Sequence, residues 1–410
     1  MRGNDTDGIL VGTRICMVVY SYYPMDQRVR REAETLKENG ALVQVICLRN
    51  EDEKRADTHN DISIHRVPLR IRRKGGYFVY FLRYFMFLFL STLALTRLFL
   101  KHKYKVVHIH SLPDYLVFCA FVPKLFGSKI ILDLHELMPE IFAAKFNLSM
   151  DSKQVQIAKA LERASVRYSD FTITTSQIRE KKLRERIQKK DIAVIMNLPK
   201  RNIYKQKDMT DFIKENDLKD SFIVSYVGRL DPVREVDVVI KAIKHIEYKI
   251  PNIVFIFCGT GEKEYIASLK SLIADLKLEK KVLLMGYVPQ EDILSYVGIS
   301  HVTICPYKFY PNLEGVLDGI SSTKVFEYLL IPKPVIVADF PAMKREFKDL
   351  VSFYKSGDHE SLGVKIFEVY KNEAESKKIA QRAQKILFKR YDPKKNEKKL
   401  VEIYRYLLSR

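Results

Sequence analysis

Short apolar runs alternate with amphipathic stretches along this chain, and the alternation restricts the fold to a few architectures. Residues 15–48 show it most simply, because an apolar strand is followed by a helical stretch and then by a second apolar strand. Val29, Ala33 and Leu36 fall on one face of the helical stretch. Gly40 comes next and suits the left-handed position after a helix end. A unit of this kind predicts a parallel sheet with helices on both faces.

The alternation occurs in two series, which we interpret as two domains. The 410 residues, 47% of them hydrophobic, are enough for two cores. The predicted class is α/β, with two doubly wound Rossmann-like domains that face a cleft and bind ligands beyond the carboxyl ends of their strands. Strands are expected at 15–20, 43–48, 62–67, 106–110, 130–134, 171–175 and 192–196, and then at 221–228, 253–257, 281–286, 302–307 and 334–339.

Composition sets the predicted domain boundaries. A polar, Lys-rich stretch without apolar periodicity, 200–219, is interpreted as the linker. The N-terminal domain is then 1–199 and the C-terminal domain 220–385. The last helical residues, 386–410, are expected to pack back toward the N-terminal domain.

The formal net charge of +20 predicts attraction to an anionic partner. The basic residues are spread along the chain and no motif that reads RNA or DNA occurs, so an acidic membrane surface or a phosphorylated ligand is favoured over nucleic acid. The five cysteines are widely spaced, which is typical of buried, reduced thiols. The first residues lack the apolar core of a secretory signal, so we expect a cytoplasmic protein.

Residues 77–100 form a long apolar and aromatic segment. Its uncharged core, 84–96, is shorter than the roughly 20 residues of a spanning helix, and a spanning helix would separate flanking strands that should join one sheet. Basic residues on one helix face and in flanking clusters favour a helix lying in the interface of an anionic membrane. The alternative is a core helix packed on the sheet. The residues expected to meet the membrane are Arg72, Arg73, Arg83, Phe85, Phe89, Arg97 and Lys101.

Five polar residues lie at or near the ends of two predicted strands. Asp133, His135 and Glu136 form one group, in which His135 can hydrogen-bond a sugar hydroxyl or act as a general base. A histidine that only caps a loop is the alternative. His108 and His110 lie two residues apart on the other strand, a spacing that suggests zinc, but no third ligand is near in sequence and no metal is expected. One of these two histidines is expected to point into the core.

Glycine-rich turns follow two strands of the second series. Gly228 permits a close turn, and Arg229 and Arg234 place two guanidinium groups near a helix start, which suits a diphosphate. Two surface arginines on a loop are the alternative. Gly259 and Gly261 resemble half of a nucleotide-binding fingerprint, a weak signal by itself.

A short apolar helix near residue 325 carries charged side chains. Ser322 and Thr323 supply hydroxyl and free N–H groups at its start, and Lys324 adds positive charge, so this start can bind an anion. Glu327, one turn further on, can accept hydrogen bonds from two ribose hydroxyls. An ion pair between Lys324 and Glu327, worth about 0.2–0.5 kcal/mol, is the alternative.

The order of these motifs resembles that of the family-4 retaining glycosyltransferases, which have the GT-B fold, along nearly the full length of the chain. Several long matches in the correct order are more specific than any one of them. The resemblance implies transfer of a sugar from a nucleotide-sugar donor to a lipid-linked or polysaccharide acceptor, at the cytoplasmic face of the cell membrane with peripheral attachment. The matching segments are 23–40, 108–140, 196–199, 228–237, 258–262, 285–289 and 322–336.

On the donor side, the resemblance implies that Glu327 binds the ribose and that Arg229 stabilises the departing diphosphate. Arg234 stands where the family usually has Lys. The donor is expected to be a UDP-sugar, with a GDP-sugar as the alternative, and no cofactor is expected. The residues implied in donor binding are Gly228, Gly261, Glu262, Tyr287, Ser322, Thr323, Lys324 and Glu327.

On the acceptor side, His135 resembles the family's histidine near the transferred sugar. A displacement on one face of the sugar, with the donor phosphate helping to deprotonate the acceptor, needs no dedicated nucleophile and usually no metal, so cationic groups and helix ends would stabilise the leaving diphosphate. The residues implied in the acceptor or diphosphate loop are Asp26, Gln27, Arg28, His110 and Asp133.

The sequence departs from the family pattern at three places. Gly319 stands where a first Glu is common, with Glu314 and Asp318 nearby, and Glu235 replaces a usual Gly. The third departure is a missing Gly-Gly loop in the first domain. These departures motivate a second hypothesis, an inactive GT-B scaffold that binds a partner. A nucleotide-sugar epimerase, which shares the architecture, is a third.

Overall fold

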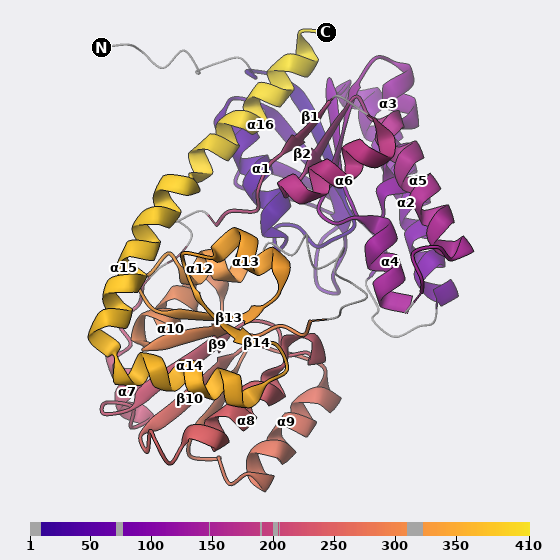
Figure 1. Ribbon diagram of the computed structural model, residues 1–410. Helices are drawn as coiled ribbons and strands as arrows, with labels where there is room; N and C mark the ends of the chain where they lie inside the picture. The colour runs from indigo at the N-terminus through magenta and orange to yellow at the C-terminus, as the bar shows by residue number, and fades with distance from the viewer. Residues whose placement is uncertain are drawn as a thin grey trace, which may run out of the picture. The chain divides into compact units, whose positions relative to one another are not determined.

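The computed structural model in Figure 1 describes residues 10–70, 77–146, 148–188, 191–199, 204, 206–309 and 323–410. The described chain divides into two compact units. The first unit comprises the chain up to Asn197 together with the C-terminal segment Lys394–Arg410. The second unit comprises Leu198–Pro393. Each unit contains one largely parallel sheet with helices on both faces (Figure 1). The prediction of two parallel-sheet α/β domains is confirmed.

The sheet of the first unit has the strand order β3-β4-β2-β1-β5-β6-β7-β8, and only the pair β3–β4 is antiparallel. The edge strand β3 was not predicted, because its four residues, Ala-Asp-Thr-His, are short and polar and show no alternation. The strands are β1 (Arg14–Val19), β2 (Leu42–Leu48), β3 (Ala56–His59), β4 (Ile62–Val67), β5 (Val106–His110), β6 (Lys129–Leu134), β7 (Phe171–Thr174) and β8 (Ile192–Val194).

Both faces of this sheet are covered, as the apolar strands predict. Successive residues of β1 point to opposite faces, so Ile15 packs with α1 and α16 while Cys16 packs with α2 and η1. The helices of the first unit are α1 (Gln27–Glu38), α2 (Tyr77–His102), η1 (Asp114–Ala120), α3 (Phe121–Leu125), α4 (Met138–Phe146), α5 (Lys153–Tyr168), α6 (Gln177–Ile187) and α16 (Pro393–Leu408).

Helix α16 is part of the core of the first unit, although some 200 residues separate it in sequence from the rest of that core. Leu400, Tyr404 and Leu407 are buried with Val29 and Leu36 of α1. The hydroxyl of Tyr404 is hydrogen-bonded to Nδ1 of His108, at 2.9 Å. The first unit therefore needs this helix for a complete core.

The second unit contains a parallel six-stranded sheet, in the order β11-β10-β9-β12-β13-β14 among the described residues. Edge strand β14 was not predicted. The strands are β9 (Phe222–Val227), β10 (Ile253–Cys258), β11 (Val282–Gly286), β12 (Val302–Cys305), β13 (Val335–Asp339) and β14 (Ser352–Lys355). The helices are α7 (Thr210–Glu215), η3 (Pro232–Arg234), α8 (Val236–Ile246), α9 (Lys263–Asp275), η4 (Gln290–Asp292), α10 (Ile293–Ile299), α12 (Thr323–Tyr328), α13 (Pro341–Phe347), α14 (His359–Lys371) and α15 (Glu373–Arg390).

Candidate active site

The first group of predicted residues gathers at the carboxyl ends of β1, β5 and β6 in the first unit. Asp26 caps α1 by accepting a hydrogen bond from the backbone N–H of Arg28, at 3.2 Å. The Arg28 guanidinium also donates to both carboxylate oxygens of Asp26, at 3.1 and 2.8 Å. Burial opposes ionisation of Asp26, but Arg28 outweighs it and holds the pKa of this carboxyl well below its usual range. Gln27 is the first residue of α1.

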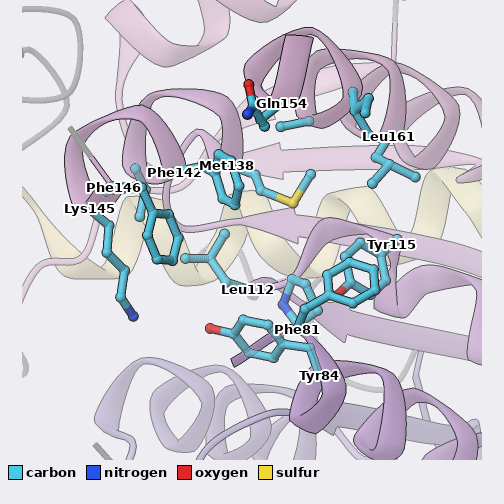
Figure 2. Close-up of a pocket in the computed structure, with 14 residues that line it drawn as sticks. Phe81, Tyr84, Leu112, Tyr115, Met138, Phe142, Lys145, Phe146, Gln154 and Leu161 are labelled. Atoms are coloured by element: carbon cyan, nitrogen blue, oxygen red, sulfur yellow. The ribbon is translucent and has the colours of Figure 1, made fainter. Parts of the chain in front are cut away.

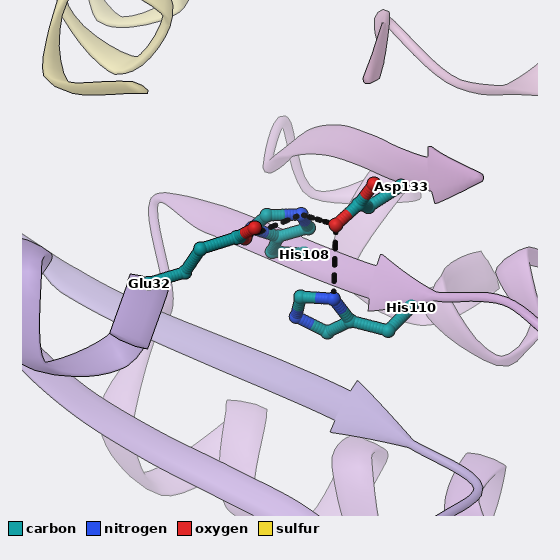
Figure 3. A group of neighbouring side chains, drawn as sticks. All are labelled: Glu32, His108, His110 and Asp133. Carbon is teal, nitrogen blue, oxygen red and sulfur yellow. Dashed lines mark hydrogen bonds and ion pairs between the residues drawn. The ribbon is translucent and has the colours of Figure 1, made fainter. Parts of the chain in front are cut away.

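Three histidines and two carboxylates are buried together near this helix start. Figure 3 shows four of them, Glu32, His108, His110 and Asp133. Oδ2 of Asp133 lies 3.2 Å from Nδ1 of His110 and 3.3 Å from Nε2 of His135. Glu32 of α1 points to His108, with 3.8 Å between Oε2 and Nε2 (Figure 3). The prediction that only one of His108 and His110 points into the core is wrong. Residues two apart on a strand share a face, and both rings are fully buried.

The charge states within this cluster follow from its surroundings. Burial, followed by repulsion from Asp133, raises the pKa of Glu32 well above its ordinary value. Burial works against ionisation of Asp133 as well, but His135 and His110 hold its pKa low. Burial lowers the pKa of His135 to about 3. His135 is therefore neutral near pH 7 and acts as a hydrogen-bonding group, with an Nδ1 atom that has no partner among the described residues.

No third metal ligand lies near His108 and His110 in sequence, but the fold brings two candidate ligands to them. Glu32 and Asp133 come from other elements, and one ligand atom from each of the four residues lies within 4.8 Å of the others. Imidazole nitrogens and carboxylate oxygens are ligands of zinc, so the group has a composition that could hold a divalent ion. Metal independence stays a prediction.

A polar pocket opens beside the cluster, with about 740 Å³ of unfilled space including the part open to solvent. Asp26, Arg28, His135 and Glu136 line it, and all four were predicted from the sequence. Arg83 of α2 lines it too, although it was expected at a membrane. The pocket therefore combines cationic, anionic and neutral hydrogen-bonding groups, as recognition of a sugar or a phosphate requires.

Glycines allow very close backbone contact at the carboxyl ends of β9 and β10 in the second unit. A Cβ atom on Gly259 would lie 1.7 Å from the carbonyl oxygen of Gly228, and one on Gly261 would lie 2.0 Å from that of Leu230. A Cβ on Gly228 would lie 2.2 Å from Nζ of Lys324. Packing against backbone thus requires Gly259 and Gly261, and Gly228 makes room for the half-buried Lys324 side chain.

Three cationic residues surround these turns. Nζ of Lys324 lies 5.5 Å from the ring centroid of Tyr226, and the Arg234 guanidinium lies over Tyr307 at 4.4 Å. Arg229 pairs with Asp231, at 3.4 Å. Burial, together with the charge of Arg234, lowers the pKa of Lys324 to about 8. An anion that neutralises Lys324 and Arg234 would stabilise their charged forms.

Glu327 of α12 is buried and accepts hydrogen bonds from side chains. The Tyr204 hydroxyl donates to its Oε1 at 2.7 Å, and Nε2 of Gln290 donates to the same atom at 3.3 Å. Among the described residues no close ion pair joins Glu327 to Lys324. Burial raises the pKa of Glu327, although the charge of Lys324 acts to lower it. This carboxyl is therefore held by polar partners in an apolar setting.

The remaining predicted residues fall into three groups. Thr323, Glu262 and Tyr287 are exposed, and Glu262 directly precedes α9. Glu235 adopts a left-handed conformation, with φ of 44°, and its carboxylate accepts a hydrogen bond from the backbone of Gly357, at 3.1 Å. The predicted residues that lie outside the described part of the chain are Arg72, Arg73, Glu314, Asp318, Gly319 and Ser322.

Sequence reasoning missed several side chains that hold these sites. Tyr204 lies in the stretch interpreted as a linker, which also contains helix α7, and no local pattern indicates its bond to Glu327. Gln290 follows a recognised segment without a pattern of its own. The burial of Glu32 could have been predicted, because this carboxylate lies on the apolar face of α1 with Val29 and Leu36.

Helix α2 exposes a large apolar surface. Phe85 and Phe89 are 56% and 57% exposed, Arg97 and Lys101 are exposed as well, and Phe87 on the opposite side is fully buried. By length and composition the segment Phe81–His102 could cross a membrane, and 22% of an apolar 18-residue window within it is buried. The strands before and after it, β4 and β5, belong to one sheet, as predicted. This topology opposes a spanning helix and leaves a helix with one free apolar side.

Two family models match the chain, one in each unit. The model described as "Glycosyl transferase 4-like domain" matches residues 25–197, and that described as "Glycosyl transferases group 1" matches residues 208–386. Each unit therefore carries a glycosyltransferase domain, of the 4-like type in the first unit and of group 1 in the second. The resemblance stated from the motifs is thereby confirmed, and the fold is the GT-B fold of these enzymes.

This glycosyltransferase is similar to two curated proteins over part of their lengths. It is 23% identical over 238 residues to TuaH of Bacillus subtilis, a glycosyltransferase assigned to teichuronic acid biosynthesis, with 57% of this chain and 56% of the relative covered. It is 29% identical over 102 residues to the GPI3 subunit of phosphatidylinositol N-acetylglucosaminyltransferase of Saccharomyces cerevisiae. That match covers 25% of this chain and 22% of the relative.

Solved structures match this glycosyltransferase over nearly its whole length. Sucrose-phosphate synthase of Thermosynechococcus elongatus has a TM-score of 0.77 at 15% identity, with 97% of this chain and 99% of that chain covered. HepE of Anabaena in complex with UDP-glucose has a TM-score of 0.70 at 16% identity, with 95% and 98% covered. At these identities the likeness establishes the fold.

Proposed function

We propose that this protein is a retaining glycosyltransferase that moves a sugar from a UDP-sugar to a lipid-linked or polysaccharide acceptor at the cytoplasmic membrane face. The observation that carries the proposal is the group in the second unit: a buried carboxylate on Glu327 on the same helix as Lys324, with Arg234 and Arg229 around the glycine turns. Such a group can bind ribose hydroxyls through the carboxylate and a diphosphate through the cations.

Two comparisons support the choice of donor and acceptor. HepE, which shares the fold, was crystallised with UDP-glucose. TuaH is assigned to teichuronic acid biosynthesis, and the GPI3 subunit belongs to a phosphatidylinositol N-acetylglucosaminyltransferase. The exposed apolar side of α2 supports peripheral attachment to a membrane, since single-sided apolar helices with flanking cations bind anionic interfaces.

The chemistry proposed for this site is electrostatic. The diphosphate leaves with growing negative charge, which Arg229 and Lys324 would stabilise. The donor phosphate would take the proton of the acceptor hydroxyl, while His135, neutral near pH 7, would hydrogen-bond the transferred sugar through its unpartnered Nδ1 atom. We expect the reaction to need no metal.

A thermal-shift screen against UDP, GDP, ADP and their sugar conjugates, without metal and with EDTA, tests the proposal. A ligand at 100 times its dissociation constant stabilises the native protein by about 2.7 kcal/mol, which raises the unfolding temperature. A shift with UDP that EDTA leaves unchanged is the expected result. No shift with any nucleotide would favour the inactive scaffold. Conversion of a donor sugar without acceptor would indicate an epimerase, and loss of binding in EDTA would show that nucleotide binding needs a metal ion.

A further inference from the structure

A second cavity, here named the apolar pocket, lies between α2, α4 and α5 of the first unit (Figure 2). Tyr84 of α2, Met138 and Phe142 of α4, and Ala158 and Leu161 of α5 line it. Its unfilled space is about 720 Å³, including the part that opens to solvent. None of the roles proposed above uses this cavity.

The apolar pocket adjoins the polar pocket. Tyr84 and Leu112 line both cavities. On one side of these two residues lie Arg28 and His135, and on the other lie methionine, leucine and phenylalanine side chains. A ligand that filled both cavities would need a polar head and an apolar tail.

The mouth of the apolar pocket adjoins the exposed apolar side of α2. Phe81 lines the pocket and is 48% exposed, and Ile157 of α5, which also lines it, is 61% exposed. Phe85 and Phe89 continue the exposed apolar surface from Phe81 along α2. If this surface lies against a bilayer, a hydrocarbon chain can pass into the pocket while keeping apolar contacts, which avoids the cost of hydrating it.

We infer that the apolar pocket binds the hydrocarbon chain of a lipid-linked acceptor whose polar head lies in the polar pocket. The inference rests on the proposed function and narrows it, because it selects a lipid-linked acceptor over a free polysaccharide. Burial of methylene groups is favourable in proportion to the apolar area removed from water, so the chain would supply much of the acceptor affinity.

A single-tryptophan reporter tests binding directly, because the protein has no tryptophan. In the Phe142→Trp variant the indole would line the apolar pocket. Farnesyl phosphate, used as the probe, is expected to shift the emission of this tryptophan saturably, and inorganic phosphate is expected to leave it unchanged. No saturable shift with farnesyl phosphate would overturn the inference.

Vesicles of dibrominated phosphatidylglycerol distinguish the acceptor chain from ordinary membrane lipid. Bromine quenches tryptophan only at short range. A Phe89→Trp variant places the reporter on the outer side of α2, where strong quenching is expected, and Trp at position 142 should be quenched much less. Equal quenching of the two variants would mean that bulk lipid fills the pocket, and this would overturn the assignment to an acceptor.

A matched pair of surface variants provides the second test. Ile157→Glu places a carboxylate at the mouth of the pocket, on a side chain that is 61% exposed, so the fold should survive. The apparent dissociation constant for farnesyl phosphate should rise roughly tenfold, equivalent to about 1.4 kcal/mol. Ile379→Glu, on α15 in the second unit with 56% exposure, is the control and should bind as the wild type does. Equal affinities in the two variants would overturn the inference.

The two proposals fail in different ways. If no nucleotide binds and no sugar is transferred, the proposed function fails, whereas the fluorescence measurement can still report a lipid chain in the pocket. If transfer occurs but Ile157→Glu acts equally well on an acceptor with a methyl group and on one with a farnesyl chain, the proposed function stands and only the inference about the pocket is overturned.

Discussion

At the scale of single residues, Glu327 has two interpretations that a conservative substitution separates. Glu327→Gln keeps the volume and can still bond Tyr204, but it loses the negative charge. If the carboxylate binds ribose hydroxyls, affinity for UDP should fall roughly 10- to 150-fold, the effect of losing a charged hydrogen bond worth about 1.5–3 kcal/mol. Isothermal titration calorimetry measures this loss.

Tyr204→Phe is the control, because it removes one internal partner of Glu327 without changing the charge. Its unfolding temperature should fall slightly while UDP affinity stays within a few-fold of the wild-type value. Unchanged UDP affinity in Glu327→Gln would instead return this residue to a structural role.

Lys324 gives a prediction about pH. Burial lowers its pKa to about 8, whereas an unfolded lysine keeps its proton until about pH 10.4. Between these values the unfolded chain binds more protons, so the contribution of Lys324 to the free energy of unfolding rises with pH. Affinity for an anionic donor should change in the opposite direction and fall above pH 8, because the cation is lost.

Titration of UDP into the protein from pH 7 to pH 9.5, in parallel with thermal unfolding, checks both trends. In Lys324→Gln the decrease in affinity above pH 8 should disappear. A pH-independent affinity in the wild type would show that this ammonium group does not meet the diphosphate.

At the scale of elements, helix α2 has one buried side and one exposed apolar side. Phe85→Gln combined with Phe89→Gln should release the protein from phosphatidylglycerol vesicles without unfolding it, since both rings are more than half exposed. Each phenylalanine removed from an apolar environment costs about 1.5–3 kcal/mol, so the partition coefficient should fall at least roughly hundredfold. Cosedimentation with vesicles measures the change.

Tyr248→Gln is a suitable control, because this aromatic side chain is 70% exposed and lies in the second unit. Phe87→Gln, at a fully buried position of α2, should lower the unfolding temperature instead. If the double variant at positions 85 and 89 unfolds as Phe87→Gln does, α2 is a core helix in solution.

An element can be predicted from the sequence when the residues that determine it are neighbours in the chain. Strands β4 and β5 have the bounds predicted from the sequence, because the apolar pattern of a strand is local to neighbouring residues. Edge strands β3 and β14 carry few apolar residues, so their pairing with β4 and β13 gave no local signal. The burial of the two histidines of β5 was predicted wrongly, because the sequence of one strand does not show which side chains cover its faces.

The candidate site shows the same limit more strongly. The motifs identified Glu327 and His135, but Tyr204 lies 123 residues from Glu327 and was taken for part of a linker. Glu32 lies on a different element from the histidines that it faces. Partners that meet only in the folded chain have no fixed sequence spacing, and a single sequence therefore cannot pair them.

At the scale of the whole molecule, the net charge of +20 predicts how membrane binding depends on salt. The screening length falls from about 10 Å at 0.1 M salt to about 3 Å at 1 M. Attachment to phosphatidylglycerol vesicles should therefore weaken steeply over this range, while UDP binding at a partly buried site should change much less. Cosedimentation with vesicles and calorimetry with UDP, at matched salt concentrations, test this prediction. Vesicle binding that does not change with salt concentration would show that the net charge does not contribute to membrane attachment.

The position of α16 has a consequence for biosynthesis. A ribosome makes this helix only after the complete second unit, yet its residues Leu400, Tyr404 and Leu407 belong to the core of the first unit. Most multidomain chains fold from the N-terminus during translation. Here the first unit cannot complete its core until α16 has been made, so one face of its sheet stays partly uncovered during translation. The second unit is continuous in sequence and can finish folding before the first. Chaperone capture during synthesis is therefore expected at the uncovered face of β1 and α1.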